Sequence, residues 1–148
     1  MRTTELICLS LAVLSAVFKI FQLSGADVLL IVSLTALAFL YFYFGFALFN
    51  NLRFRDIFKQ ETYQSVPARK LIYAALSGIF LSVSVLAFLF NLLHLPGAFV
   101  MLTVGLVGCL GLLFPVWSNY RHSPAKPQRN LLIRLGSVLL LHAIIWLK

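Results

Sequence analysis

A short motif, FKIFQLSGAD, occupies residues 18–27 between two apolar runs. A similar motif, FNLLHLPGAF, occupies residues 90–99. Both fit the pattern Phe-x-x-x-x-Leu-x-Gly-Ala, and the similarity extends without gaps into the runs on either side. Turn residues between long apolar runs are typical of helical hairpins. The sequence therefore predicts two tandem hairpins that form an internal repeat.

The Gly-Ala pair of each motif is the expected point of reversal. Glycine accepts a positive φ freely, so the chain can turn within a few residues. The following alanine lets the two helix ends approach closely, and the phenylalanine that opens the motif is expected to plug the hairpin end. The residues assigned to this turn motif are Gly25, Ala26, Gly97 and Ala98.

The composition indicates what surrounds these hairpins. Apolar residues make up 61% of the 148 residues and charged residues 11%, against about 45–50% and about 25% in soluble domains. This excludes a soluble globular domain and a disordered chain. A bilayer core takes about 20 apolar helical residues, and runs suited to this lie at 6–23, 28–49, 71–95, 98–117 and 131–147.

The predicted fold is an all-α integral membrane protein with five transmembrane helices. Repeats with an even number of spans enter from the same side, so a pseudo-twofold axis along the membrane normal is expected. The two hairpins should form a four-helix bundle with a peripheral fifth helix. The expected segments are hairpin 1 at 1–50, a basic cytoplasmic loop at 51–70, hairpin 2 at 71–117, a cytoplasmic linker at 118–130 and the fifth helix at 131–148.

Two local features refine these segments. In the basic loop, Phe54, Ile57 and Phe58 have the spacing of a short amphipathic helix on the membrane surface, and Pro67 suits the first turn of the next helix. Residues 24–26 have the small side chains of a signal-peptide cleavage site. The internal repeat favours a retained first helix over cleavage.

The charge distribution predicts the orientation. The formal net charge is +8, but the basic residues lie between apolar runs, where they set topology and contact anionic headgroups rather than nucleic acid. With the N-terminus in the cytoplasm, ten of the 12 Lys and Arg residues lie inside. Only Lys19 and Lys148 lie outside. The prediction is a bacterial inner (plasma) membrane protein whose C-terminus is periplasmic if the fifth helix spans.

A possible polar or ion site is predicted near the outer ends of the hairpins, from Lys19, Asp27, Asn91 and His94. Lys19 and Asp27 flank the first turn. They can form a coupled proton or ion site, or a pair that locks the hairpin and reaches the headgroups. The second repeat has Asn91 and Phe99 at the equivalent positions, which does not support a symmetric pathway.

Metal binding and cofactors are not expected. A histidine such as His94 can titrate near neutral pH or bind a metal, but no second ligand stands at a suitable spacing in sequence. A joint site with His142, in the fifth run, is the remaining option. Cys8 and Cys109 lie inside apolar runs and are interpreted as small packing residues rather than a disulfide.

Two further patterns concern helix packing. Gly105, Gly108 and Gly111 recur every three residues, which suits close packing inside the bundle or, alternatively, a homo-oligomer interface. Residues 41–46 read YFYFGF. This aromatic run favours anchoring at the membrane interface, with a quinone or lipid groove as the alternative.

The split motif resembles a recurrent Bacteroidota membrane hairpin, best known in the transmembrane L subunit of the gliding-motility and type IX secretion motor. That family's signature is close to Phe-Lys-Ile-x-His-x-Pro-Gly-Ala. Its first half stands at residues 18–20 and its second half at residues 94–98. The motor subunit has one hairpin and a long cytoplasmic tail, whereas this chain duplicates the hairpin. The resemblance therefore implies a shared hairpin unit.

The functional prediction follows from these points. The sequence has no paired intramembrane carboxylates, phosphate loop or nucleophile–base pair, so enzymatic activity is not expected. The leading hypothesis is a structural or accessory subunit of a membrane complex, with other membrane proteins or a second copy as partners. The alternative is a small transporter or channel subunit that uses the polar site.

Overall fold

The computed structural model describes residues 2–49, 68–122 and 126–146. This part of the chain is all-α, and each helix is long and apolar enough to cross a membrane. The prediction of an all-α membrane protein with five membrane-spanning helices is confirmed within these residues. The helices are α1 (Arg2–Ile20), α2 (Ala26–Phe49), α4 (Ala68–Leu92), α5 (Ala98–His122) and α6 (Lys126–Trp146).

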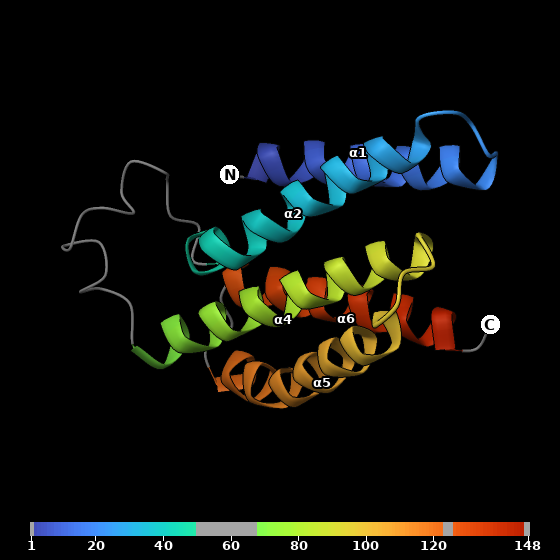
Figure 1. The fold of residues 1–148 in the computed structure, drawn as a ribbon. Helices are drawn as coiled ribbons and strands as arrows, with labels where there is room; N and C mark the ends of the chain where they lie inside the picture. Colours follow the sequence, from blue (N-terminus) through green and yellow to red (C-terminus); the bar gives the residue numbers. More distant parts are fainter. Residues whose placement is uncertain (1, 50–67, 123–125, 147–148) are drawn as a thin grey trace.

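The helices run side by side, so that the molecule has two distinct ends (Figure 1). We call the end with the turns at Gly25 and Gly97 the turn end, and the opposite end, where α2 finishes and α4 begins, the loop end. The described chain starts at the loop end and finishes at the turn end (Figure 1). The ends of the described chain therefore lie at opposite ends of the helices.

Both hairpin turns have the same backbone geometry. Gln22 and His94 have φ values of 53° and 54°, and Gly25 and Gly97 have values of 84° and 87°. The N–H of Leu23 donates to the carbonyl five residues earlier at 3.0 Å, and the N–H of Leu95 does so at 2.8 Å. This is the Schellman helix ending, in which one residue in the left-handed region closes the last turn.

The Schellman geometry explains the repeated pattern. The acceptors of these two bonds are the carbonyls of Phe18 and Phe90. In a Schellman ending, the residue that accepts this bond (C3) and the residue that donates it (C″) commonly make an apolar side-chain contact. Phe and Leu five residues apart are therefore what such a turn needs. The positive φ predicted at the two glycines is confirmed, while the duplication as such stays a prediction.

The helix bounds differ from the predicted spans at both ends of the bundle. At the turn end, α1 and α4 stop at Ile20 and Leu92, before the apolar runs finish. At the loop end, α5 and α6 extend through much of the linker predicted at 118–130. A helix satisfies its backbone hydrogen bonds internally, so it can continue past the membrane into water. The apolar run therefore indicates the part of the helix inside the membrane, not the residue at which the helix ends. The predicted surface helix at 54–58 and Pro67 lie outside the described residues.

The two hairpins meet where α2 crosses α4. A Cβ atom placed on Gly45 would lie 2.8 Å from the Cα atom of Gly78, and one placed on Gly78 would lie 2.6 Å from the carbonyl oxygen of Tyr41. The backbones therefore approach closely at a pair of glycines. Small residues of this kind are what allow transmembrane helices to pack tightly.

The fifth helix is less peripheral than the sequence predicts. Besides α5, it contacts α4 and α2, and it lies behind α4 in Figure 1. Leu135 and His142 are completely buried. One face of α6 thus belongs to the interior, while its other described side chains, apart from Leu131, are half-buried or exposed.

Candidate functional site

A long groove lies between α1 and α6, with α2 and α4 as its floor. It has a volume of about 1780 Å³ and runs the length of the bundle, from Glu5 and Arg134 at the loop end to Asp27 and His94 at the turn end. Its middle is lined by apolar side chains, which include Leu9, Ala12, Leu34, Leu37, Val85 and Leu141. The hairpins and the fifth helix therefore form an open bundle within the described part of the chain.

A buried polar cluster closes the loop end of this groove. Arg134 of α6 donates two hydrogen bonds to the carboxylate of Glu5 on α1, one from each of two guanidinium nitrogens, and the bond from Nε measures 2.6 Å. The hydroxyl of Tyr41 on α2 donates to the same carboxylate at 2.9 Å. The guanidinium carbon of Arg134 lies 5.4 Å from the centre of the Phe49 ring.

This cluster satisfies its own charges. A bidentate Arg–carboxylate pair is among the strongest hydrogen-bonded arrangements in proteins, and the aromatic ring adds a cation–π contact. Leaving either charge alone at this depth would be costly, because a charged side chain inside a membrane requires a partner. The cluster therefore joins α1, α2 and α6 through groups that the first half and the last helix of the chain supply separately.

Sequence reasoning missed the cluster. Glu5 stands beside Arg2 in the first turn of α1 and looks like a helix-end residue, and Arg134 counts toward the basic side. Their separation of 129 residues carries no pairing signal. The one clue was that a fifth span with Arg134 inside it needs an acidic partner.

The residues of the predicted polar site lie at the turn end of the groove. Lys19, Asp27, Asn91 and His94 all line the groove. The Lys19 ammonium donates to the carboxylate of Asp27 at 2.6 Å, with side chains 33% and 56% exposed. This distance favours the pair that locks the first hairpin. An exposed ion pair of this type contributes about 0–1 kcal/mol.

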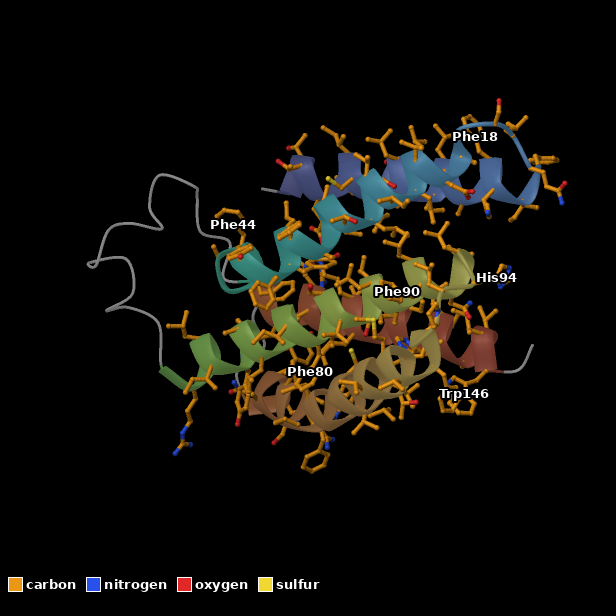
Figure 2. All side chains as sticks on the ribbon, viewed as in Figure 1. Phe18, Phe44, Phe80, Phe90, His94 and Trp146 are labelled. Atoms are coloured by element: carbon orange, nitrogen blue, oxygen red, sulfur yellow. The ribbon has the colours of Figure 1, made fainter. Side chains whose placement is uncertain are left out.

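His94 and His142 have different surroundings. Figure 2 shows His94 at the turn end, pointing away from the helices. His142 is buried, with Nδ1 2.9 Å from the carbonyl oxygen of Val138 and its ring 4.8 Å from that of Phe88. Its Nε2 atom has no hydrogen-bond partner among the described residues. Those residues also contain no group of three or more His, Cys, Asp or Glu side chains that could hold a metal ion.

The glycine series on α5 divides between two environments. An added Cβ atom at Gly105 would lie 2.5 Å from the hydroxyl of Ser84, and one at Gly108 would overlap the ring of Phe80, both on α4. Figure 2 shows Phe80 pointing from α4 toward α5. An added Cβ at Gly111 would meet no described atom within 4 Å. The first two glycines therefore serve packing inside the bundle, and only Gly111 leaves room for a neighbour.

The aromatic run also points in several directions. Tyr41 is buried in the cluster, whereas Phe42 and Tyr43 are more than half exposed. This suits interfacial anchoring for the exposed rings. The side chain of Phe46 is outside the described ones.

The cysteines lie apart from the polar sites. Both are free, and Cys109 is buried with its sulfur 3.7 Å from the hydroxyl of Ser84. Cys8 is half-buried in α1. Their surroundings fit the packing role predicted for them.

No family model, no curated protein and no solved structure matches this chain. The resemblance of its hairpins to the motor subunit therefore stays a prediction.

Proposed function

We propose that this protein is a structural or accessory subunit of a membrane complex. The observation that carries the proposal is the groove between α1 and α6, which is apolar through its middle and joined across its loop end by Glu5 and Arg134. An apolar middle offers few partners to a hydrated solute, which would lose its hydrogen bonds to water there. It suits contact with hydrophobic components of a complex inside the bilayer.

The setting of this function is part of the same proposal. The positive-inside pattern favours the bacterial inner membrane, with the loop end in the cytoplasm and the turn end in the periplasm. The hairpin resemblance favours a complex related to gliding motility or secretion. No catalytic activity is proposed, and neither is binding to nucleic acid.

Photocrosslinking in cells tests the subunit function. A photoreactive residue placed at Leu6 or Ile144 would stand on the two rims of the groove, where both side chains are more than half exposed. The matched control is Phe114, which is 79% exposed on α5 and lies outside the groove. We expect a discrete adduct with another membrane protein from the rim positions and not from the control.

Two outcomes would contradict the subunit function. One is the absence of any protein adduct from the rims in cells that express the protein at its natural level. The other is an adduct with a second copy of this chain alone, which would indicate an independent homo-oligomer.

A transporter or channel subunit is the second candidate. It is favoured by the position of Lys19, Asp27, Asn91 and His94, which all line the turn end of one groove. Planar-bilayer recording of the purified protein tests this candidate. A steady conductance that falls in the Lys19→Met variant would support it, and a membrane without conductance would remove the channel form of it.

A further inference from the structure

The size of the groove points to a long hydrophobic ligand. Pockets for drug-sized ligands measure about 300–1,000 Å³, and this groove measures about 1780 Å³. Its apolar middle suits a hydrocarbon chain, because such a chain has no polar groups that need partners. A ligand that follows the groove must then place any polar group at one of its two ends.

At the loop end, the described charged side chains that line the groove already pair with each other. The carboxylate of Glu5 accepts hydrogen bonds from both Arg134 and Tyr41, and Arg134 also lies over the Phe49 ring. Opposite charges are therefore matched within the cluster. A charged headgroup placed there would have to compete with a buried bidentate pair, which is costly to break.

At the turn end, a positive and a negative side chain are both partly exposed. Lys19 and Asp27 are paired, yet their side chains are 33% and 56% exposed. An ammonium group carries three donors and a carboxylate about four acceptor positions, so one hydrogen bond between them leaves both able to bind more. Asn91 and His94 also line the groove and add further hydrogen-bonding groups.

We propose that the groove binds a phospholipid whose headgroup carries both a phosphate and an ammonium group. The phosphate lies at Lys19, the ammonium group lies at Asp27, and one acyl chain follows the apolar middle toward the Glu5–Arg134 cluster. Between Glu5 and Lys19, α1 rises roughly 21 Å at about 1.5 Å per residue. This exceeds roughly 15 Å, half of a bilayer core, so the groove holds an acyl chain of one leaflet.

The lipid site rests on the same apolar groove as the proposed function, but it requires no protein partner. The test therefore uses purified full-length protein in detergent, with the mass of lipid-bound species measured by native mass spectrometry. The probes are phosphatidylethanolamine and phosphatidylglycerol with identical acyl chains. We expect the wild-type protein to retain phosphatidylethanolamine up to about fivefold better, the scale of one exposed ion pair.

Charge variants predict opposite shifts in this preference. Asp27→Asn leaves the charge of Lys19 unmatched, so the preference should move toward the anionic phosphatidylglycerol. Lys19→Met leaves Asp27 alone and should exclude phosphatidylglycerol further. Arg121→Met is the matched control, since Arg121 is exposed on α5 and does not line the groove, and it should change neither value.

A third variant keeps the proposal testable if a charge variant fails to fold. Ala16 lines the groove without taking part in the charged pair, so Ala16→Phe should lower the retention of both lipids. Equal retention of the two lipids by the wild-type protein would overturn the proposal. So would an unchanged preference in Asp27→Asn, or full retention of both lipids in Ala16→Phe. Partner capture in cells can fail independently of all these results.

Discussion

Gly97 holds a backbone angle of φ 87°, which residues with a Cβ atom adopt at a cost. We expect Gly97→Ala to lower the free energy of unfolding by about 1 kcal/mol or more. Gly136→Ala is the control, because an added Cβ there meets no described atom within 4 Å inside helix α6. It should raise stability by up to about 1 kcal/mol. Thermal unfolding in detergent, followed by intrinsic fluorescence, measures both, and equal effects of the two substitutions would contradict the turn geometry.

The sequence predicts the backbone conformation of a residue where that conformation depends on the residue type and its immediate neighbours. The positive φ of Gly25 and Gly97 could be predicted because both are glycines in an expected turn, where this residue type accepts a positive φ freely. The left-handed conformations of Gln22 and His94 could not, because the sequence pattern marks the Schellman ending only once its hydrogen bonds are known. His94 was accordingly considered for its chemistry, although it also has a part in ending α4.

The Glu5–Arg134 pair has a consequence for the insertion of a whole element. An arginine inside a membrane helix is costly to insert without a partner, and here Glu5 compensates the charge of Arg134. We expect Glu5→Gln to destabilise the fold by about 3–5 kcal/mol and to leave part of the molecules with α6 uninserted. A reporter fused to the C-terminus would then appear on the same side of the membrane as the N-terminus.

Two variants give this topology experiment its controls. Tyr41→Phe removes one hydrogen bond from Glu5 but leaves the ion pair, so the reporter should stay on the wild-type side. The double variant Glu5→Leu with Arg134→Leu removes both charges and should restore spanning, because apolar residues often replace a buried pair without loss. Wild-type topology and stability in Glu5→Gln would show that the pair does not hold α6.

The crossing of α2 and α4 gives a second prediction about elements. A Cβ atom on Gly78 would lie 2.6 Å from the carbonyl oxygen of Tyr41, so the helices must separate to admit it. Gly78→Ala should lower the free energy of unfolding by about 1–3 kcal/mol. Gly111→Ala, on the open face of α5, should have little effect in the same detergent denaturation assay. A loss of similar size in both variants would contradict close packing at Gly78.

The sequence predicts the elements better than their contacts. Apolar run length identifies each described span because the bilayer requires a helix of that length. It does not identify Gly45 and Gly78 as a crossing point, since this depends on which faces of α2 and α4 meet. Hydropathy identifies the apolar part of a helix that lies inside the membrane. It therefore misses the polar ends of α5 and α6, which continue beyond the apolar runs.

At the scale of the molecule, the groove depends on helices that are far apart in the chain. Lys19, Asp27, Asn91 and His94 were predicted as a polar group near one end of the hairpins, and the structure places all four along the groove. The groove itself was not predicted, because its walls come from α1 and α6. Its closure at the loop end requires Glu5 and Arg134, whose pairing no local pattern reveals.

The middle of this groove is lined by apolar side chains and should therefore be dry within the bilayer. Thiol labelling in a variant without Cys8 and Cys109 tests it most directly, using single cysteines at Leu9 in the middle and Asn91 at the turn end, both of which line the groove. We predict that Leu9→Cys in the folded protein resists both a charged, membrane-impermeant thiosulfonate and a neutral maleimide, because a thiol in a dry, apolar site does not ionise to the reactive thiolate. Asn91→Cys should react with both reagents, and denaturing the Leu9→Cys variant should restore its reaction with maleimide. Rapid reaction of Leu9→Cys with the charged reagent from the Asn91 side would instead show a water-filled path through the groove.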